Sequence, residues 1–341
     1  MNDKKIMIYG ANGYTGRLLT KHLLKTGLRP ILAARSNKIE AIGKELNCPT
    51  KIFSIENAAA DLDDIDFFVN LAGPFSITQD KLIQACVKSK TNYLDIAGEY
   101  DEVKNAFKYN DESSEAGIAI LPAAGFGVVP TDIAAKIACE NMTNPISLKI
   151  IYATVGGASR GTLKTVLKDI QKNGHILVNG KYQVAKPAQS EITVDVFSKR
   201  FKAVYNPWRA DLFSAYKSTG VPNIETYSEF PGFVVSMMKG KLNWLKNLIL
   251  NRLINFLPEG PSDKQLAKGS TYIKAIAKNS KGDESIVEMK GPEAYLFTAL
   301  SIQKMMQLVL SKHAKGCITP SDLGVNWVYD LKEIQIKSIA G

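Results

Sequence analysis

A glycine-rich turn near the start of the chain constrains its fold more than any other feature. The turn reads Gly10-Ala-Asn-Gly13-Tyr-Thr-Gly16 and lies between an apolar stretch at 5–9 and a helical pattern at 14–25. Glycines in such a turn let the backbone bend sharply and approach a pyrophosphate, which then faces the N–H groups that open the helix. The pattern therefore predicts a strand, a dinucleotide-binding turn and a helix; a purely structural glycine turn is the alternative.

Strand and helix patterns alternate through the first third of the chain. Further strands are expected at 30–34, 51–54, 67–71, 93–96 and 118–121. This alternation predicts a parallel sheet with helices on both faces, and ligands of such a sheet bind beyond the carboxyl ends of its strands. We therefore predict an α/β protein with a Rossmann domain over 1–122, to which the helices at 129–140 and 293–312 are candidate additions.

The residue that follows the second strand distinguishes two forms of the dinucleotide. An Asp or Glu at this place typically binds the ribose 2′-hydroxyl of NAD. This chain has Arg35, followed by Ser36. A guanidinium can hold the 2′-phosphate of NADP in a two-pronged contact, whereas a carboxylate would repel it. The sequence thus favours NADP(H), and a surface ion pair of Arg35 is the alternative.

Two more strand ends are expected to border the nicotinamide. The fourth strand ends at 70–75 and the fifth at 95–99, and small residues there leave room for a dinucleotide. The predicted cofactor-binding residues are Gly10, Asn12, Gly13, Tyr14, Thr15, Gly16, Arg35, Ser36, Asn70, Ala72, Gly73, Pro74, Phe75 and Gly98. Glu99, ranked before Asp95, is the candidate catalytic acid. A residue of the second domain or water could also supply the proton, and both segments could be ordinary strand-to-helix turns.

Residues 123–341 are expected to form a second domain for substrate binding and dimerisation. Asn179-Gly180 predicts a hairpin between 176–178 and 182–185, and 280–283 predicts a second hairpin. A loop at 156–162 opens the next helix, where hydroxyls and an Arg suit an anionic substrate group. The candidate substrate-binding residues are Ser159, Arg160 and Thr162; a helix capped by Ser159 or Thr162 is the alternative.

The segment 233–257 is basic and contains no acidic residue. Its cationic residues are Lys239, Lys241, Lys246 and Arg252, and its apolar residues recur at helical spacing: Leu242, Leu245, Leu248, Ile249, Leu253, Phe256 and Leu257. We expect an amphipathic helix. Such a helix can cover a core or an apolar substrate, form a dimer contact, or lie on an anionic membrane surface.

Composition narrows the choice of partners and compartment. Lys and Arg number 43 against 33 Asp and Glu, a net charge of +10, which favours anionic partners. Without a basic stripe interleaved with aromatic residues, nucleic acid is not an expected partner. The four Cys and three His are scattered, so neither a disulfide framework nor a metal site is expected. A cytoplasmic protein is expected, because neither a signal peptide nor an apolar run of ~18 residues is found.

Motifs in the same order along most of the chain resemble those of the saccharopine dehydrogenase-like oxidoreductases, which include trans-acting enoyl reductases. They are GANGYTG at 10–16, AARS at 33–36, NLAGPF at 70–75, YLDIAGE at 93–99, PAAGFGVVPTD at 122–132, GGASRGTL at 156–163, EGPSDKQLAKG at 259–269, GPEAYLFTAL at 291–300 and GCITPSDLG at 316–324. The resemblance implies an NADP-binding Rossmann domain and an α/β domain with an open, largely antiparallel sheet. Relatives often carry a Phe-Asp pair where this chain has Phe126-Gly127, so a polar role is not carried over there.

These features together predict hydride transfer between NADP(H) and a C=C, C=O or C=N bond of a small or lipid-like substrate, in a homodimer. The protein would hold the two reacting carbons at about 3–3.5 Å. A non-catalytic NADP sensor or scaffold is one alternative. An atypical short-chain reductase is another, and it would need Tyr182 and Lys186 on one helix. Their place after an Asn-Gly turn predicts a strand, which separates them by roughly 13 Å rather than about 6 Å.

Overall fold

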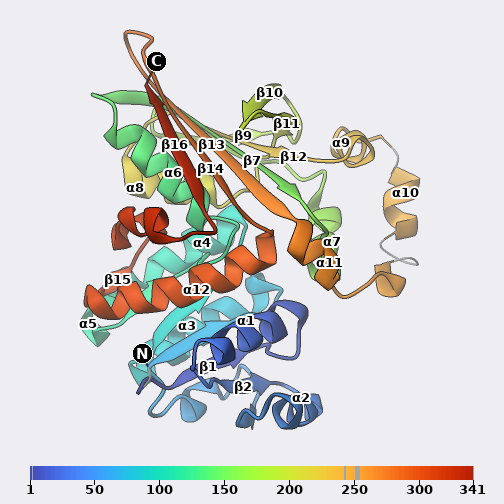
Figure 1. Cartoon of the computed structure of the whole chain (residues 1–341), viewed down its shortest axis with the longest axis vertical. Helices are drawn as coiled ribbons and strands as arrows, with labels where there is room; N and C mark the ends of the chain where they lie inside the picture. Colours follow the sequence, from blue (N-terminus) through green and yellow to red (C-terminus); the bar gives the residue numbers. More distant parts are fainter. Residues whose placement is uncertain (2, 242, 250–253, 341) are drawn as a thin grey trace. The chain divides into compact units, whose positions relative to one another are not determined.

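The computed structural model describes residues 1, 3–241, 243–249 and 254–340, which divide into two compact units (Figure 1). The first unit comprises Met1–Val129 and Tyr295–Leu323, and the second comprises Pro130–Ala294 and Gly324–Gly341. The first unit is therefore discontinuous, whereas the sequence suggested one boundary after residue 122. Of the two helices considered as additions, α12 (Ala294–Ser311) lies almost wholly in the first unit and α6 (Val129–Glu140) in the second.

The first unit is built on a parallel sheet with the strand order β15-β6-β5-β4-β1-β2-β3. The strands are β1 Ile6–Tyr9, β2 Ile31–Ala34, β3 Thr50–Ile52, β4 Phe67–Asn70, β5 Asn92–Asp95, β6 Ala119–Leu121 and β15 Gly316–Cys317. Every residue of β1 and β4 is buried, as expected for strands covered on both faces. The order reverses between β1 and β4, and this reversal is where doubly wound sheets bind ligands. The predicted Rossmann fold is confirmed.

Helices cover this sheet on both faces (Figure 1). They are α1 Tyr14–Lys25, α2 Lys38–Leu46, α3 Phe75–Ser89, α4 Tyr100–Ala106, α5 Asn110–Ala116 and α12, with short 3-10 turns η1 Ala58–Asp61 and η2 Phe107–Tyr109. The loop after β6 is bonded to α12, because Thr298 Oγ1 accepts from Phe126 N at 3.1 Å and Ser301 Oγ donates to Ala124 O at 2.9 Å. The late helix is thus part of the first unit's structure.

The second unit is built on a mostly antiparallel sheet with the strand order β10-β11-β12-β7-β13-β14-β16. The strands are β7 Pro145–Val155, β8 Gly174–Val178, β9 Lys181–Ala185, β10 Glu191–Val196, β11 Lys199–Tyr205, β12 Ile224–Glu229, β13 Ser270–Asn279, β14 Glu284–Pro292 and β16 Gln335–Ala340. The pair β12–β7 is parallel. Both predicted hairpins are confirmed, and Asn179 and Gly180 have φ of 51° and 73°, as a tight two-residue turn requires.

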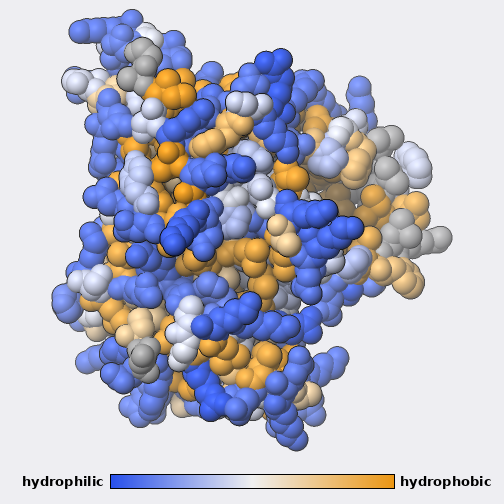
Figure 2. All heavy atoms as spheres, in the orientation of Figure 1, coloured by the Kyte–Doolittle hydropathy of each residue, from blue (hydrophilic) through white to orange (hydrophobic). Residues whose placement is uncertain are grey.

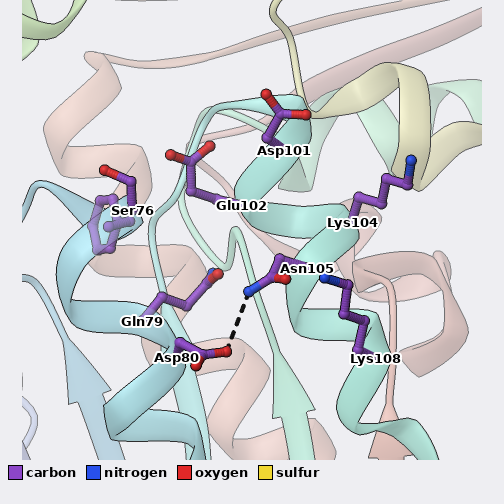
Figure 3. Close-up of a pocket in the computed structure, with 9 residues that line it drawn as sticks. Ser76, Gln79, Asp80, Asp101, Glu102, Lys104, Asn105 and Lys108 are labelled. Carbon is purple, nitrogen blue, oxygen red and sulfur yellow. Dashed lines mark hydrogen bonds between the residues drawn. The ribbon is translucent and has the colours of Figure 1, made fainter.

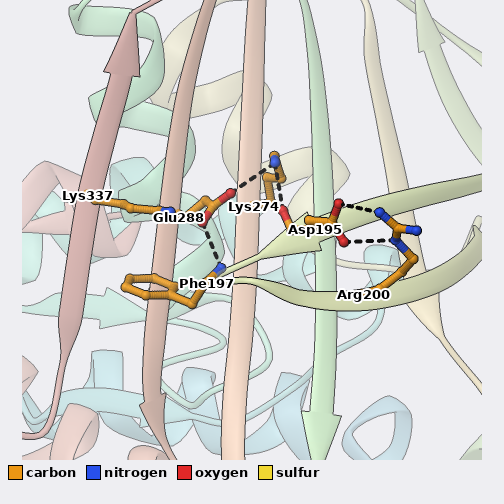
Figure 4. Close-up of polar contacts among 6 residues, drawn as sticks. All are labelled: Asp195, Phe197, Arg200, Lys274, Glu288 and Lys337. Carbon is orange, nitrogen blue, oxygen red and sulfur yellow. Dashed lines mark hydrogen bonds and ion pairs between the residues drawn. The ribbon is translucent and has the colours of Figure 1, made fainter.

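The β10–β11 hairpin is fastened to the main sheet at its turn (Figure 4). Phe197 N donates to Glu288 Oε2 at 2.8 Å, and Lys274 and Lys337 each lie 2.9 Å from the same carboxylate. Glu288 is only 3% exposed. Beside it, the Phe201 ring lies 4.9 Å from the Tyr272 ring. A buried charge with two cationic partners therefore holds the hairpin in register.

The helices of the second unit include several short ones. They are α6, α7 Arg160–Asp169, α8 Asp211–Thr219, α9 Gly232–Met238, α10 Asn243–Leu248, η4 Ile254–Phe256, α11 Asp263–Lys268 and the 3-10 turn η6 Asn326–Asp330, whereas the turn η5 Pro320–Leu323 after β15 belongs to the first unit. The prediction of one amphipathic helix over 233–257 is wrong, because Gly240 has φ +78° and ends any helix there. Leu242, Arg252 and Leu253 lie outside the described residues. None of the helices described is both long and apolar enough to cross a membrane.

Candidate functional site

The three glycines of the first turn differ in what surrounds them. A Cβ on Gly10, whose φ is +84°, would lie 2.8 Å from Ala72 N, and one on Gly16 would lie 2.6 Å from the Cα of Ala11. Packing against backbone therefore requires both glycines. A Cβ on Gly13 would lie 3.3 Å from Gly10 O, which is a tight contact but less severe than those at the other two glycines. Gly13 is the extended N-cap residue of α1, so its backbone is placed for close approach by a pyrophosphate.

Arg35 and Ser36 follow the strand next to this turn. The turn is bonded to β2, since Gly10 N and Ala11 N both donate to Ala33 O at 2.9 and 3.3 Å. Arg35 is exposed and Ser36 is half-buried. The structure thus brings the glycine turn and the guanidinium to the same carboxyl edge of the β1–β2 pair. Of the other residues predicted on the turn, Asn12 is exposed, and Tyr14 and Thr15 are half-buried.

Asn70 shapes the loop after β4 from inside the fold. Its buried side chain donates to Thr78 Oγ1 at 3.2 Å and to Tyr93 Oη at 3.0 Å, and it accepts from Ala72 N at 3.0 Å. A Cβ on Gly73 would have no atom within 4 Å, and Gly73–Pro74 is a cis peptide. The same open space surrounds Gly98 after β5. Two neighbouring strands therefore end in backbone that faces open space.

Asp95 is fully buried at the end of β5 and joins three parts of the first unit. Its carboxylate accepts from the N–H groups of Ala97 and Ala123, at 3.0 and 2.9 Å. It also accepts from Gln79 Nε2 at 2.8 Å and Tyr93 Oη at 2.9 Å. Burial raises the pKa of Asp95, and these hydrogen bonds oppose the rise. With four donors on its two oxygens, Asp95 holds the loops at this edge in place.

Glu99 and Glu102 lie at the start of α4, immediately beyond Gly98. Glu99 is the half-buried N-cap residue, and its Oε2 accepts from Gly98 N at 2.9 Å. Glu102 is also half-buried, and burial, reinforced by the charge of Glu99, raises its pKa to about 7. Residues three apart are neighbours on a helix, so the spacing of the two acids was the available signal. Sequence reasoning named Glu99 and missed Glu102.

A pocket of about 370 Å³ opens between α3 and α4 beside these acids (Figure 3). Its lining residues are Phe75, Ser76, Gln79, Asp80, Asp101, Glu102, Lys104, Asn105 and Lys108. Asn105 Nδ2 donates to Asp80 Oδ1 at 3.3 Å across the pocket. The Glu102 side chain points toward the start of α3, where Ser76 lies, whereas Lys104 points away from that helix (Figure 3). Phe75 belongs to the loop that was predicted to bind the cofactor.

The predicted substrate-binding residues lie in the second unit, where the structure shows the capping alternative. Ser159 is the N-cap residue of α7, and its Oγ accepts from Thr162 N at 3.2 Å. Arg160 donates from Nε and Nη2 to Leu257 O at 3.0 and 2.5 Å. A role of Ser159, Arg160 and Thr162 in substrate binding stays a prediction.

The pair required by a short-chain reductase does not form a catalytic dyad. Tyr182 lies on strand β9, and Lys186 follows the end of that strand. They are therefore not one turn apart on a helix, as the sequence reasoning anticipated, and they cannot share a proton in the manner of that class.

The fold and the turn define the first unit as a dinucleotide-binding Rossmann domain of the kind found in oxidoreductases. Residues 6–121 match the family described as the saccharopine dehydrogenase NADP binding domain. The predicted resemblance is confirmed. Residues 6–121 thus form an NADP(H)-binding domain similar to that of the saccharopine dehydrogenase family.

Three relatives with different names are similar to parts of this chain. A saccharopine dehydrogenase-like oxidoreductase of Bos taurus is 24% identical over 46% of this chain and 42% of its own length. A trans-acting enoyl reductase of Mycobacterium ulcerans is 28% identical over 38% of this chain and 34% of its own. A lipid droplet localized protein of Caenorhabditis elegans is 22% identical over 79% of this chain and 77% of its own. The first two alignments span less than half of either relative.

The residues at the carboxyl edge fit NADP(H). Gly13 is the exposed N-cap residue at the start of α1, where N–H groups suit a pyrophosphate, and Arg35 is an exposed cation one strand away. Gly73 and Gly98 present open backbone at the ends of β4 and β5, where the nicotinamide half would lie. The role of these residues in binding the dinucleotide stays a prediction.

Proposed function

We propose that this protein is an NADP(H)-dependent oxidoreductase that reduces, or in reverse forms, a C=C, C=O or C=N bond of a small or lipid-like substrate. The observation that carries the proposal is the glycine turn bonded to β2, with Arg35 just beyond that strand, together with two carboxyl groups, Glu99 and Glu102, that follow Gly98 at the end of β5. A domain that only sensed NADP(H) would not need titratable carboxyl groups beside the nicotinamide end.

Some residues of the chain bind the dinucleotide, and others position the loops or hold the proton. N–H groups at the start of α1 face the pyrophosphate, and Arg35 binds the 2′-phosphate. Asp95 holds the loops of the edge in position through its contacts with Ala97 and Ala123. The bound dinucleotide supplies the hydride. Glu99 is the first candidate to hold the proton, because it adjoins the open backbone of Gly98.

The proposal is tested first by binding and then by turnover. Calorimetry should show NADPH binding more tightly than NADH. NADPH oxidation is then followed with three acceptors: a 2-enoyl thioester, an aldehyde and a cyclic imine. Oxidation with one of them supports the proposal. Tight NADPH binding without oxidation by any acceptor would favour the sensor alternative, and absence of binding would contradict both.

We propose, as a second function, that the surface around α10 binds anionic lipid. Three aromatic side chains are strongly exposed there, Phe233 at 49%, Trp244 at 67% and Phe256 at 88%. Figure 2 shows apolar side chains on the part of the surface where Figure 1 draws α10. The segment 233–257 is basic and lacks acidic residues, and aromatic side chains beside lysines suit a lipid headgroup layer. One relative's name also refers to lipid droplets.

Flotation with vesicles tests this second function. The wild-type chain is expected to float with vesicles of phosphatidylcholine and phosphatidylserine, and less with phosphatidylcholine alone. Replacing Trp244 and Phe256 together by Ser should weaken binding about tenfold or more, since each buried aromatic contributes roughly 1.5–3 kcal/mol. Val184→Ser is the matched control, because Val184 is 73% exposed on β9. Equal flotation of all three proteins would contradict the proposal.

A further inference from the structure

Glu102 is the acid at the predicted nicotinamide end whose surroundings best suit proton transfer. Asp95 has both oxygens occupied by four donors, and Glu99 accepts from Gly98 N at the start of its helix. Glu102 lines the pocket between α3 and α4 and points toward the start of α3 (Figure 3). It is therefore half-buried yet in contact with a space that a small molecule can enter.

The groups that face Glu102 are mainly acidic. On its own helix these are Glu99 and Asp101, and the charge of Asp95 on β5 acts on it as well. Asp80 of α3 lines the same pocket, together with Lys104 and Lys108. Lys104 points away from the start of α3, and Asp80 accepts a hydrogen bond from Tyr109 at 2.5 Å. Neighbouring negative charge and burial both favour a protonated Glu102, because each disfavours its ionised form.

We propose that Glu102 is the catalytic general acid of the reaction, delivering its proton through the pocket between α3 and α4. This inference rests on the proposed function and corrects its choice of acid from Glu99 to Glu102. Glu99 then acts as a positioning residue that keeps Glu102 protonated. A carboxyl group with a pKa near the working pH is suited to such a role, since it is protonated before the step and releases the proton during it.

The step balances in atoms and electrons. One atom of the substrate's double bond would take the hydride that bound NADPH supplies, and the π-electron pair would move to the other atom. That second atom takes the proton from Glu102, whose O–H bond breaks and leaves a carboxylate. The pocket is open to solvent, so water returns a proton to Glu102 before the next turnover.

The first test measures the titration of Glu102 without substrate. The full chain is labelled with ¹³C at the side-chain carboxyl of Glu, and the Glu102 signal is assigned by its absence in Glu102→Gln, or in Glu102→Ala if the Gln variant does not fold. We expect this signal to titrate near pH 7. Titration at an ordinary glutamate value of about 4.3 would overturn the proposal.

The second test uses whichever of the enoyl, aldehyde or imine acceptors the protein reduces. Glu102→Gln should lower kcat by about 10²–10⁴-fold and abolish the fall of kcat above neutral pH. NADPH affinity, measured by fluorescence, should change by less than about threefold, under ~1 kcal/mol. The matched control is Glu112→Gln, the same change in the first turn of α5, outside the pocket.

The outcomes separate this inference from the proposed function. A Glu102→Gln variant that keeps the wild-type rate and pH profile would overturn the role of Glu102 and leave the oxidoreductase intact. A wild-type protein that binds NADPH but reduces none of the acceptors would overturn both.

Discussion

The glycines of the first turn differ in function, and substitutions should distinguish a glycine needed for packing from one needed for dinucleotide binding. A Cβ at Gly16 would lie 2.6 Å from backbone atoms, whereas one at Gly13 would meet Gly10 O at 3.3 Å. We expect Gly16→Ala to cost about 2 kcal/mol or more of stability, as overpacked sites do. Gly13→Ala should lose less stability than Gly16→Ala and bind NADPH at least about tenfold more weakly, because its Cβ occupies the pyrophosphate's approach. Equal losses of stability in the two variants would contradict this division.

Arg35 sets the preference between the two dinucleotides. Its guanidinium is exposed beyond β2, where a 2′-phosphate would lie. Arg35→Ala is expected to weaken NADPH binding by about 10–100-fold, the 1.5–3 kcal/mol of a charged hydrogen bond, and to leave NADH binding nearly unchanged. Calorimetry with both dinucleotides checks this. A parallel loss of both affinities would show that Arg35 does not contact the 2′-phosphate.

Glu102 should make the protein less stable as pH rises. Its pKa in the folded chain, about 7, lies above the ordinary value of 4.5. Its contribution to stability is therefore fully present below about pH 4.5 and is lost as pH rises through about 7. Glu102→Gln should remove this loss and raise stability at about pH 8 by roughly 1–2 kcal/mol, a shift discounted for partial exposure. Urea unfolding below about pH 4.5 and at about pH 8 measures the stability of the wild-type chain, of Glu102→Gln and of the control Glu112→Gln. Identical pH dependence of stability in all three proteins would contradict this prediction.

At the scale of elements, the β10–β11 hairpin depends on one buried carboxylate. Burial alone would raise the pKa of Glu288, but Phe197 N–H, Lys337 and Lys274 outweigh it and lower that pKa. The stabilisation is thus present above the ordinary glutamate pKa and is lost as pH falls through the lowered one. Glu288→Gln leaves two lysines without their anion, and we expect a loss of about 3 kcal/mol at neutral pH.

Hydrogen exchange shows which part of the molecule loses stability in Glu288→Gln. Amides of 197–201 should exchange faster in Glu288→Gln, because the turn of the hairpin loses its anchor. Asp195→Asn is the matched control on the same hairpin, since its ion pair with Arg200 is largely exposed (Figure 4) and solvent screening leaves it little effect on stability. Faster exchange in the control but not in Glu288→Gln would contradict the assignment.

Elements whose conformation is set by nearby residues could be predicted from the sequence. The Asn179-Gly180 turn and the helix at 14–25 are where the residue pattern placed them. For Glu102 the spacing from Glu99 was a local signal, but its pocket could not be predicted, because that pocket is also lined by Ser76 and Gln79 of α3, which are distant in sequence. The prediction of a helix over 233–257 was wrong for a related reason. Periodicity suggested a continuous helix, but Gly240 adopts a positive φ that no helix accommodates.

At the scale of the whole molecule, net charge should assist binding of the dinucleotide. The chain carries +10, and NADPH is strongly anionic. Salt screens this attraction, with a Debye length of ~10 Å at 0.1 M and ~3 Å at 1 M. NADPH affinity should therefore fall by about five- to tenfold between low and high salt, and NADH affinity by less. Titrations at several NaCl concentrations check this; affinity that does not vary with salt would contradict it.

The first unit is completed by residues that lie late in the sequence, and this affects how it folds during protein synthesis. Strand β15 pairs with β6, but residues 316–317 leave the ribosome long after residues 119–121. At about 5–20 residues per second, the edge of β6 stays unpaired for on the order of ten seconds or more. An unpaired edge strand is a site of aggregation. The nascent chain therefore passes through a stage in which its nucleotide domain has emerged but its sheet still lacks β15.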